Sequence, residues 1–328
     1  MDRANEILKQ YRLNQELYVK LSHDLNDILS SIIASCDVKI SDLAIRIKSE
    51  ESLMKKVNYR NSFKHINDVH DVVACRIITL FEEDIDVLAK ALEENFEVVL
   101  VSDRMKKHNQ YREEFGYNSL HYTVKFSKER CKLVEYKKYD GILIEIQLRS
   151  ALQHAWCEIE HGLGYKSQYE VPAYIRRRLN RLSATLELLD EEFVSISKEI
   201  DEYNRGMDKP DKVLKTDINN ISLAHYATQH PDLRMIFINQ VCDYDESTIS
   251  QLRIVKRLNL LGFGYIHELD KWVNGNLDKI NKVAKVWMEH YPQKVMNYFL
   301  VLLWIVMAIG MEDGDNDSIW NEIQQSQF

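Results

Sequence analysis

Polar residues of three kinds alternate with apolar ones on a predicted strand, and they are the first candidates for chemistry. From Ile142 to Leu148 every second residue is apolar, which is the period of a strand with one buried face. The other positions hold a carboxylate, an amide and a guanidinium, from Glu145, Gln147 and Arg149. A solvated strand face more often carries Thr, Ser or Lys, so this row indicates a site; an ordinary charged surface remains the alternative.

Cationic residues gather around the predicted start of a helix. Ser49 or Glu50 can open this helix, whose first amide groups lack intrahelical partners and form the positive end of its dipole. Phosphates bind readily at such a helix start, so the segment predicts a cradle for polyphosphate. A lysine-rich surface helix is the alternative, and the chain has no GxxxxGK[ST] loop. The cradle residues are Arg46, Lys48, Ser52, Lys55 and Lys56.

A second acid stands at the beginning of another predicted strand. The segment His70–Leu80 is rich in Val and Ile and is predicted to be buried, with Asp71 at its start and Arg76 inside it. An acid at a strand end is a common Mg²⁺ ligand, because Mg²⁺ binds one or two carboxylates together with substrate phosphates; it is equally a common turn residue. Asp71 and Glu145 on different strands indicate a phosphoryl-group enzyme with a metal between two carboxylates.

An aromatic residue follows the charged loop Asp103–Glu114. Gly116 permits close approach of the backbone, and the ring of Tyr117 can stack on a base. A ring packed against the protein is the alternative interpretation. The basic side chains of the loop are Arg104, Lys106, Lys107 and Arg112.

Strands and helices must alternate to bring these residues together. The predicted pattern gives a mixed sheet flanked by helices, an α+β fold. Apolar residues at helical spacing predict one helix from Ala4 to Ala34, since no Pro or Gly interrupts it. A short apolar segment at 42–47 leads into the cationic helix. The strands are predicted at 70–80, 96–101, 118–126 and 142–148, and helices at 82–95 and from 152 onward.

The C-terminal part carries no chemical motif. A long amphipathic helix, Pro172–Tyr203, is expected either to close the catalytic domain or to join a neighbour. The polar segment after it contains a Gly and a Pro, which is typical of a linker. We therefore predict a sheet domain with flanking helices at 1–206, a linker at 207–220 and an all-α domain at 221–328.

The run Tyr298–Met311 is apolar on all sides. It is shorter than the roughly 20 residues that a membrane-spanning helix needs, so a buried core helix is favoured. A helix docked on a partner and a membrane element are the alternatives.

Composition narrows the class of protein. The 328 residues are 45% apolar, which is typical of a globular protein, and the net charge of −8 argues against general binding of DNA. The five cysteines form no CxxC pair, which argues against zinc sites and disulfide frameworks. The N-terminus is polar and lacks the features of a signal peptide, so a cytoplasmic setting is the default expectation.

Four ordered motifs between about residues 40 and 170 resemble the RelA/SpoT synthetase domain of (p)ppGpp synthetases. RIKSEESLMKK is similar to the family's RxKxxxSxxxK, and HDVVACR to its DxxGxR. FGYNSLHYTV is similar to its GYRSLH loop, and IEIQLRSALQHAWCEIEHGLGYK to its EIQIRT…WAxxEH…YK. The resemblance implies a nucleotidyltransferase-like sheet of about five strands that transfers the β,γ-pyrophosphate of ATP to the 3′-OH of GDP or GTP.

The resemblance also implies roles for individual residues. The ATP phosphates would be held by Arg46, Lys48 and Lys56, with Ser52 nearby and Arg76 supporting the site. Asp71 and Glu145 would bind Mg²⁺, and Glu145 would take the proton of the attacking hydroxyl. On the acceptor side, Tyr117 would stack on the base, His121 would contact phosphate or sugar, and Gln147 and Arg149 would line the pocket.

Three departures from the family pattern leave the acceptor open. Ala74 replaces the glycine of DxxGxR, Asn118 replaces the arginine after Gly-Tyr, and the loop before Gly116 is longer than usual. Some small toxic members of the family modify the 3′ end of tRNA, so a tRNA acceptor, with the C-terminal domain restraining the enzyme, is one alternative. Lys106, Lys107 and the cluster Arg176–Arg178 would then contact tRNA phosphates. A second alternative is a catalytically silent nucleotide sensor. A homo-oligomer is compatible with all of these readings.

Overall fold

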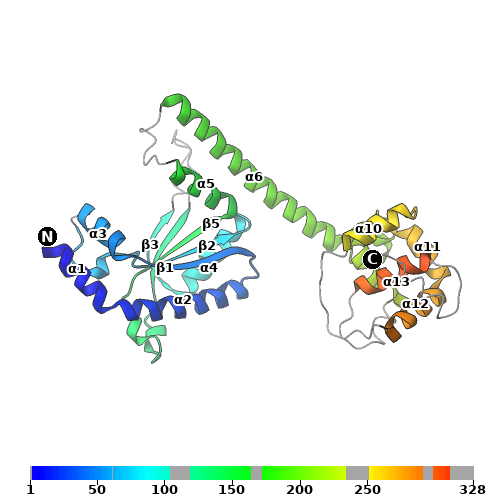
Figure 1. Ribbon diagram of the computed structural model, residues 1–328, viewed down its shortest axis with the longest axis horizontal. Helices are drawn as coiled ribbons and strands as arrows, with labels where there is room; N and C mark the ends of the chain where they lie inside the picture. The colour runs from blue at the N-terminus through cyan, green and yellow to red at the C-terminus, as the bar shows by residue number, and fades with distance from the viewer. Residues whose placement is uncertain are drawn as a thin grey trace. The chain divides into compact units, whose positions relative to one another are not determined.

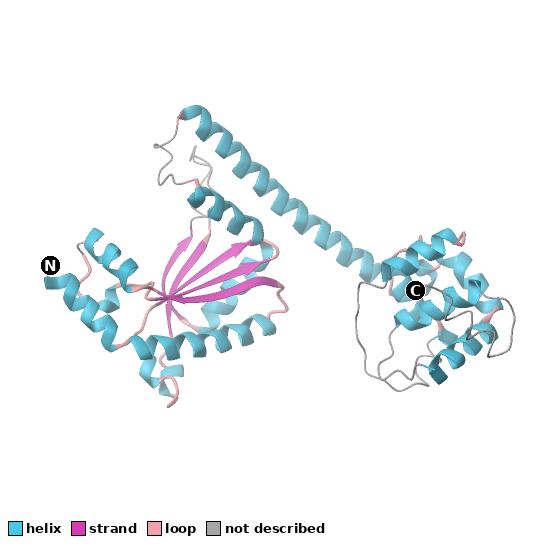
Figure 2. Ribbon diagram, viewed as in Figure 1, coloured by secondary structure: helices cyan, strands magenta, loops and turns pink. Residues whose placement is uncertain are grey.

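The computed structural model describes residues 2–60, 62–103, 119–163, 172–233, 251–290 and 298–310. The chain divides into two compact units, Met1–Ser197 and Lys198–Phe328. Strands lie in the first unit, and the described part of the second unit is helical (Figures 1 and 2). The predicted α+β fold with a helical C-terminal region is therefore confirmed.

A mixed five-stranded sheet forms the centre of the first unit, in the order β1-β2-β5-β4-β3 (Figure 2, magenta). Strands β2 and β5 are parallel, and every other neighbouring pair is antiparallel. The parallel pair lies inside the sheet, so β5, which carries Glu145, and β2, which begins two residues after Asp71, each have a neighbouring strand on both sides. The strands are β1 Ile40–Ile47, β2 Val73–Thr79, β3 Glu97–Asp103, β4 Leu120–Lys125 and β5 Ile144–Ser150.

The apolar face of the sheet is covered by α2 (Gln15–Ser35) and α4 (Glu83–Asn95). Leucines four residues apart place one stripe of α2 on the sheet, as a helical period requires. Apolar and polar residues alternate along β5, so all of its apolar side chains point to the face that α2 and α4 cover. Fully buried members of the core include Leu21, Leu25, Leu29, Ile144, Ile146 and Leu148.

The prediction of one helix from Ala4 to Ala34 is wrong at Asn14. The structure has α1 (Asp2–Leu13) and α2, with Asn14 between them at φ −103° and ψ 6°. The Asn14 side chain donates to the carbonyl of Gln10, which competes with regular helical hydrogen bonding. The break leaves Tyr11 and Tyr18 stacked, with ring centres 5.8 Å apart and both rings buried.

The first unit also contains α3 Glu50–Tyr59 and α5 Ala151–Gly162, and α6 Ala173–Gly206 begins in the first unit and ends in the second (Figure 1). Ser49 caps α3 by accepting from the backbone N–H of Ser52, and Ser150 caps α5 through a capping box with Gln153. The cap at Ser150 turns the end of β5 directly into a helix. Short 3-10 turns cover Ile66–Asp68, Arg130–Lys132 and Lys137–Tyr139.

The second unit has its own apolar core, and α13 lies within it. Residues Val301 to Ala308 of α13 are all buried, so the predicted core helix is confirmed. None of the helices described is both long and apolar enough to cross a membrane. The helices are α7 Pro210–Val213, α8 Asn220–Gln229, α10 Gln251–Leu260, α11 Ile266–Gly275, α12 Leu277–His290 and α13 Tyr298–Gly310.

The segment predicted as a linker, 207–220, differs from that prediction. Met207, Val213 and Ile218 are buried in the core of the second unit, and α7 begins at Pro210. Apolar residues spaced through a polar sequence anchor the segment, so the polar composition was a poor guide.

Candidate active site

Paired residues of four strands place the predicted site residues on one face of the sheet. Directly paired residues in a sheet have side chains on the same face. One row crosses the sheet through Arg46, Ala74, Glu145 and Thr123. The next row crosses it through Ala44, Arg76, Gln147 and His121. The face opposite the apolar core therefore carries an acid, two arginines, an amide and an imidazole together.

Asp71 is held by two lysines at the start of β2. The Nζ atoms of Lys48 and Lys56 each lie 2.8 Å from Oδ2 of Asp71. Burial raises the pKa of Asp71, but the two lysines outweigh this effect, so the pKa is lowered and the carboxylate is ionised. The other oxygen, Oδ1, is buried and has no hydrogen-bond partner among the described residues. It is an acceptor that is free for a ligand.

Lys48 is fixed through its backbone, which orients its side chain. Its N–H donates to the carbonyl of Val72 over 2.8 Å, and its carbonyl accepts from the hydroxyl of Tyr11 over 2.7 Å. These bonds tie the end of β1 to both β2 and α1. The orientation of Lys48 toward Asp71 is therefore set by the packing of three elements.

Helix α3 presents Lys56 to the site and Lys55 to solvent. Lys55 pairs with Glu51, and both of these side chains are about three-quarters exposed. Leu53 and Val57 are fully buried and fix the rotation of the helix. Ser52 lies in the first turn, where its hydroxyl accepts from that of Ser49 over 2.9 Å.

Glu145 lies at the centre of a polar chain on β5 and β4. Its Oε1 is 3.5 Å from Nδ1 of His121, and its Oε2 accepts from Nε2 of Gln147 over 3.1 Å. Burial raises the pKa of Glu145, but His121 and Gln147 outweigh burial, so the pKa is lowered. The negative charge of Asp71 raises the pKa of Glu145, against the effect of His121 and Gln147. The two acids are therefore close enough to interact electrostatically.

Two arginines and an imidazole extend the polar face under α5. Arg149 donates to Oε1 of Gln147 over 3.3 Å and is 8% exposed. Arg76 lies 3.3 Å from Glu158 of α5, and burial together with Arg76 lowers the pKa of His154. This part of the face carries net positive charge and can bind an anion.

The comparisons with known proteins concern this same region. A model described as "Region found in RelA / SpoT proteins" matches residues 45–170. The chain is 30% identical over 170 residues to the GTP pyrophosphokinase YjbM of Bacillus subtilis (strain 168), covering 51% of this chain and 76% of that relative. The chain belongs to the RelA/SpoT family. The predicted resemblance is confirmed.

Other RelA/SpoT relatives extend the similarity. The GTP pyrophosphokinase YwaC of Bacillus subtilis (strain 168) is 28% identical over 211 residues, which covers 61% of this chain and 97% of YwaC. A crystal structure of small alarmone synthetase 1 from Bacillus subtilis bound to its product pppGpp is 26% identical, with a TM-score of 0.48, covering 59% of this chain and 99% of that one. The family model ends before α6 begins, so the second unit lies outside that match.

The structure brings together most of the residues that the RelA/SpoT motifs predicted. Lys48, Lys56 and Asp71 form one group, and Glu145, Gln147 and His121 form another. Arg46, Arg76 and Arg149 lie on the same face of the sheet, and Ser52 lies on α3. Tyr117 and the loop lysines Lys106 and Lys107 lie outside the described residues.

Two contacts of this RelA/SpoT site were missed at the level of sequence. The hydroxyl of Ser119 lies 2.6 Å from Nε2 of His121, on the ring nitrogen opposite Glu145. His154 and Glu158 of α5 lie beside Arg76. The spacing of His154 and Glu158, four residues apart on one helix, was the available signal, since such residues share a helix face.

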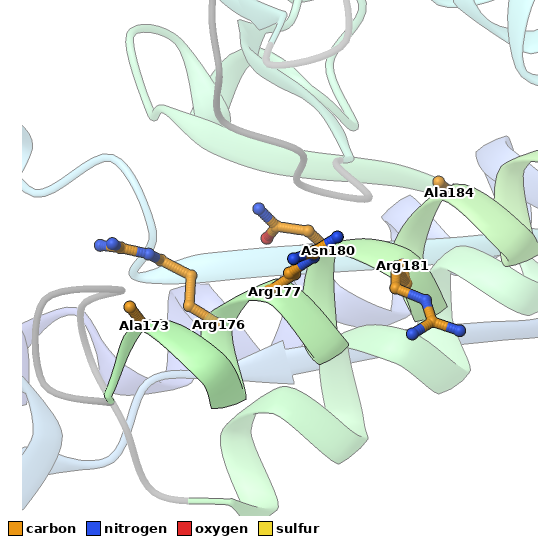
Figure 3. A pocket seen from close by; sticks show the side chains of 6 residues that line it. All are labelled: Ala173, Arg176, Arg177, Asn180, Arg181 and Ala184. Atoms are coloured by element: carbon orange, nitrogen blue, oxygen red, sulfur yellow. The ribbon is translucent and has the colours of Figure 1, made fainter.

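A shallow hollow along the first turns of α6 lies apart from these groups. Figure 3 shows three arginines along it, with Asn180 between two of them. None of the residues that line it is a predicted catalytic residue of the RelA/SpoT motifs. They are Ala173, Arg176, Arg177, Asn180, Arg181 and Ala184.

Proposed function

We propose that this chain is a Mg²⁺-dependent pyrophosphokinase that transfers the β,γ-pyrophosphate of ATP to the 3′-OH of GDP or GTP. The observation that carries the proposal is that Asp71, which is held by Lys48 and Lys56, lies within electrostatic reach of Glu145. Membership of the RelA/SpoT family and the names of its GTP pyrophosphokinase relatives support the same reaction class.

The donor side of the proposed site is the group around Asp71. Lys48 and Lys56 supply two ammonium groups that neutralise the triphosphate of ATP. Arg46 and Arg76 add guanidinium groups on the sheet face, and Ser52 adds a hydroxyl at the start of α3. Such positioning of the triphosphate is the main requirement of phosphoryl-group transfer.

The residues present fit a Mg²⁺ ion. Oδ1 of Asp71 is buried and lacks a partner among the described residues, while Oδ2 is already used by two lysines. No cluster of three or more His, Cys, Asp or Glu residues appears in the described parts of the chain. That agrees with Mg²⁺, which needs only one or two carboxylates when substrate phosphates supply the rest. When bound, the ion would neutralise charge on the phosphates, with Asp71 and Glu145 as its ligands.

Glu145 is the proposed base. The 3′ oxygen of the acceptor attacks the β-phosphorus, the bond from that phosphorus to the bridging oxygen of the α-phosphate breaks, and AMP leaves with the electron pair. Glu145 takes the proton of the 3′-OH. His121 and Gln147 hold the carboxylate ionised and oriented for this role. On the acceptor side, His121, Gln147 and Arg149 would contact sugar and phosphate, and Tyr117 would stack on the base.

The test is incubation of the full chain with γ-labelled ATP, Mg²⁺ and either GDP, GTP or tRNA. Label on GDP or GTP, with release of AMP, is expected. ATP that binds without label reaching any acceptor would reject the proposal and favour a catalytically silent nucleotide sensor. The same assay on a chain that ends at Gly206 tests whether the second unit restrains the enzyme.

The arginines of α6 favour tRNA as the second candidate acceptor. Arg176, Arg177 and Arg181 lie together along the first turns of the helix (Figure 3). Cationic side chains in a row bind the phosphate backbone of nucleic acid without reading its sequence. Label on tRNA, lost at high salt and in an Arg177→Ala/Arg181→Ala variant, would select this alternative.

A further inference from the structure

Helix α1 packs on the segment that carries the lysines of the proposed donor side. The helix ends at Leu13, and the match to the family model begins only at residue 45. Among the described elements, α3 packs most extensively against α1. Lys56 reaches Asp71 from α3 over 2.8 Å, so the position of its ammonium group depends on where α1 lies.

Two arginines of α1 bind α3 near its two ends. Arg12 donates to both carboxylate oxygens of Glu50, the first residue of α3, over 3.0 and 2.7 Å. Arg3 donates to the carbonyl of Val57, in the last turn of α3, over 3.2 Å. The two contacts lie about two turns apart along α3, so together they limit how the helix can tilt against α1.

The hydroxyl of Tyr11 connects α1 to the site more directly. It donates to the carbonyl of Lys48 over 2.7 Å, and Tyr11 is 3% exposed. The ring of Tyr11 is stacked on that of Tyr18, which fixes where the hydroxyl lies. The side chain of the same lysine ends 2.8 Å from Asp71. A hydrogen bond that holds the backbone of Lys48 therefore also limits where its ammonium group can lie.

We propose that α1 is part of the ATP site and that Tyr11 is a positioning residue, which holds Lys48 ready for the phosphates of ATP. This role rests on the proposed function, in which Lys48 binds the donor triphosphate. Tyr11 acts through the backbone of Lys48 and not by contact with the substrate. A lysine that is already held in place loses less conformational freedom when ATP binds, so the hydrogen bond strengthens binding.

A purely structural role for Tyr11 is the alternative, and it has a different consequence. A hydroxyl that only stabilised the fold would, when removed, lower the fraction of folded chains. The number of ATP molecules bound per chain would then fall, while the folded chains would keep their dissociation constant. A positioning role predicts the reverse, a higher dissociation constant at unchanged stoichiometry. Calorimetric titration measures the two quantities separately.

The test titrates the full chain with ATP and Mg²⁺ in the absence of any acceptor. Tyr11→Phe keeps the stacked ring and removes the hydroxyl, so the dissociation constant for ATP should rise about 3- to 10-fold, as for the loss of one hydrogen bond. Tyr18→Phe is the matched control. Tyr18 is also 3% exposed, and its hydroxyl makes no hydrogen bond with the described residues, so the dissociation constant should stay the same. An unchanged constant in Tyr11→Phe, or an equal rise in both variants, would overturn the role of Tyr11.

A double variant tests whether Tyr11 acts through Lys48. Lys48→Met removes the ammonium group that Tyr11 is proposed to hold, so Tyr11→Phe should weaken ATP binding no further in that background. Effects that simply add would overturn this route. Because no acceptor is present, a chain that binds ATP but labels neither GDP, GTP nor tRNA would reject the proposed transfer and leave the role of Tyr11 intact. A chain that binds no ATP would overturn both.

Discussion

Ala74 lies directly opposite Glu145 in the parallel pairing of β2 with β5, and its methyl group shares the polar face with that carboxylate. Arg46 lies opposite Ala74 on the other side, so a small residue separates a cation from the proposed base. Ala74 is 2% exposed, which leaves little room for a larger side chain. The size of this residue should therefore affect how Glu145 and ATP are positioned.

We expect Ala74→Val to lower kcat/KM by at least about 10-fold, because two added methyl groups would displace Arg46 or Glu145. Ala74→Gly should retain activity, since it removes volume without displacing either group. Steady-state kinetics of both variants provide the measurement, and thermal unfolding shows whether either has lost its fold. Equal activity of the Val variant and the unaltered chain would show that the face is not tightly packed here.

Glu145→Gln should abolish transfer while ATP still binds. The amide cannot accept the proton of the hydroxyl, and loss of a general base typically lowers the rate about 100- to 10,000-fold. The matched control is Glu129→Gln, since Glu129 is exposed and pairs only with Lys132 among the described residues. Single-turnover assays measure the chemical step, and calorimetry measures ATP binding. Substantial residual turnover would reject Glu145 as the base.

Lys56→Met should weaken the use of ATP, whereas Lys55→Met should not. Lys56 lies 2.8 Å from Asp71, while its neighbour Lys55 pairs with Glu51 in solvent. Loss of a partly buried charge-assisted contact to phosphate costs about 1.5–3 kcal/mol, so kcat/KM for ATP should fall about 10- to 100-fold. Equal kinetics of the two variants would place the triphosphate elsewhere.

Asp71→Asn should destabilise the first unit at neutral pH by about 1–3 kcal/mol, because two lysines lose their shared partner. The pKa of Asp71 is lowered from 3.8 in the folded state, so its carboxylate stabilises the fold above about pH 4. That contribution is lost as the pH falls through the lowered pKa. Urea unfolding of both chains at pH 7 and pH 3 should show a difference at pH 7 that shrinks at pH 3.

Asp190→Ala should loosen α6 from the sheet domain. Asp190 is 1% exposed and accepts from Ser150, which caps α5 at the end of β5. Removal of Asp190 leaves the buried O–H of Ser150 without its acceptor, although the oxygen still accepts from the N–H of Gln153, and should cost about 1–3 kcal/mol. Hydrogen exchange of the first turn of α5 should accelerate in the variant; unchanged protection there would mean that Ser150 caps α5 independently of α6.

Local patterns predicted the elements that carry the acids. The alternation of Ile144, Ile146 and Leu148 with polar residues predicted β5 and its two faces, because both follow from a period of two. The run of Val and Ile after Asp71 predicted β2 as a buried strand, because a short continuous apolar run is typical of a strand covered on both faces. The four motifs also follow one another in the order of the RelA/SpoT family. Residues of different motifs were therefore expected to meet in one site.

Features that depend on distant contacts were not predictable in this way. The contact of Ser150 with Asp190 joins residues on β5 and α6, and neither sequence segment indicates the other. The break at Asn14, where the side chain donates to the carbonyl of Gln10, is not visible in the helical spacing of the apolar residues. The burial of Met207 and Val213 likewise requires the second unit to be folded.

The parallel pairing of β2 with β5 has a consequence for how such an enzyme changes over time. The two strands stay neighbours whatever length of chain connects them, because their hydrogen bonds and not the connection fix their positions. The connection between them carries β3, β4 and His121. Insertions there can therefore alter which acceptor is recognised while the carboxylates keep their separation, so substrate choice is able to diverge without rebuilding the reaction centre.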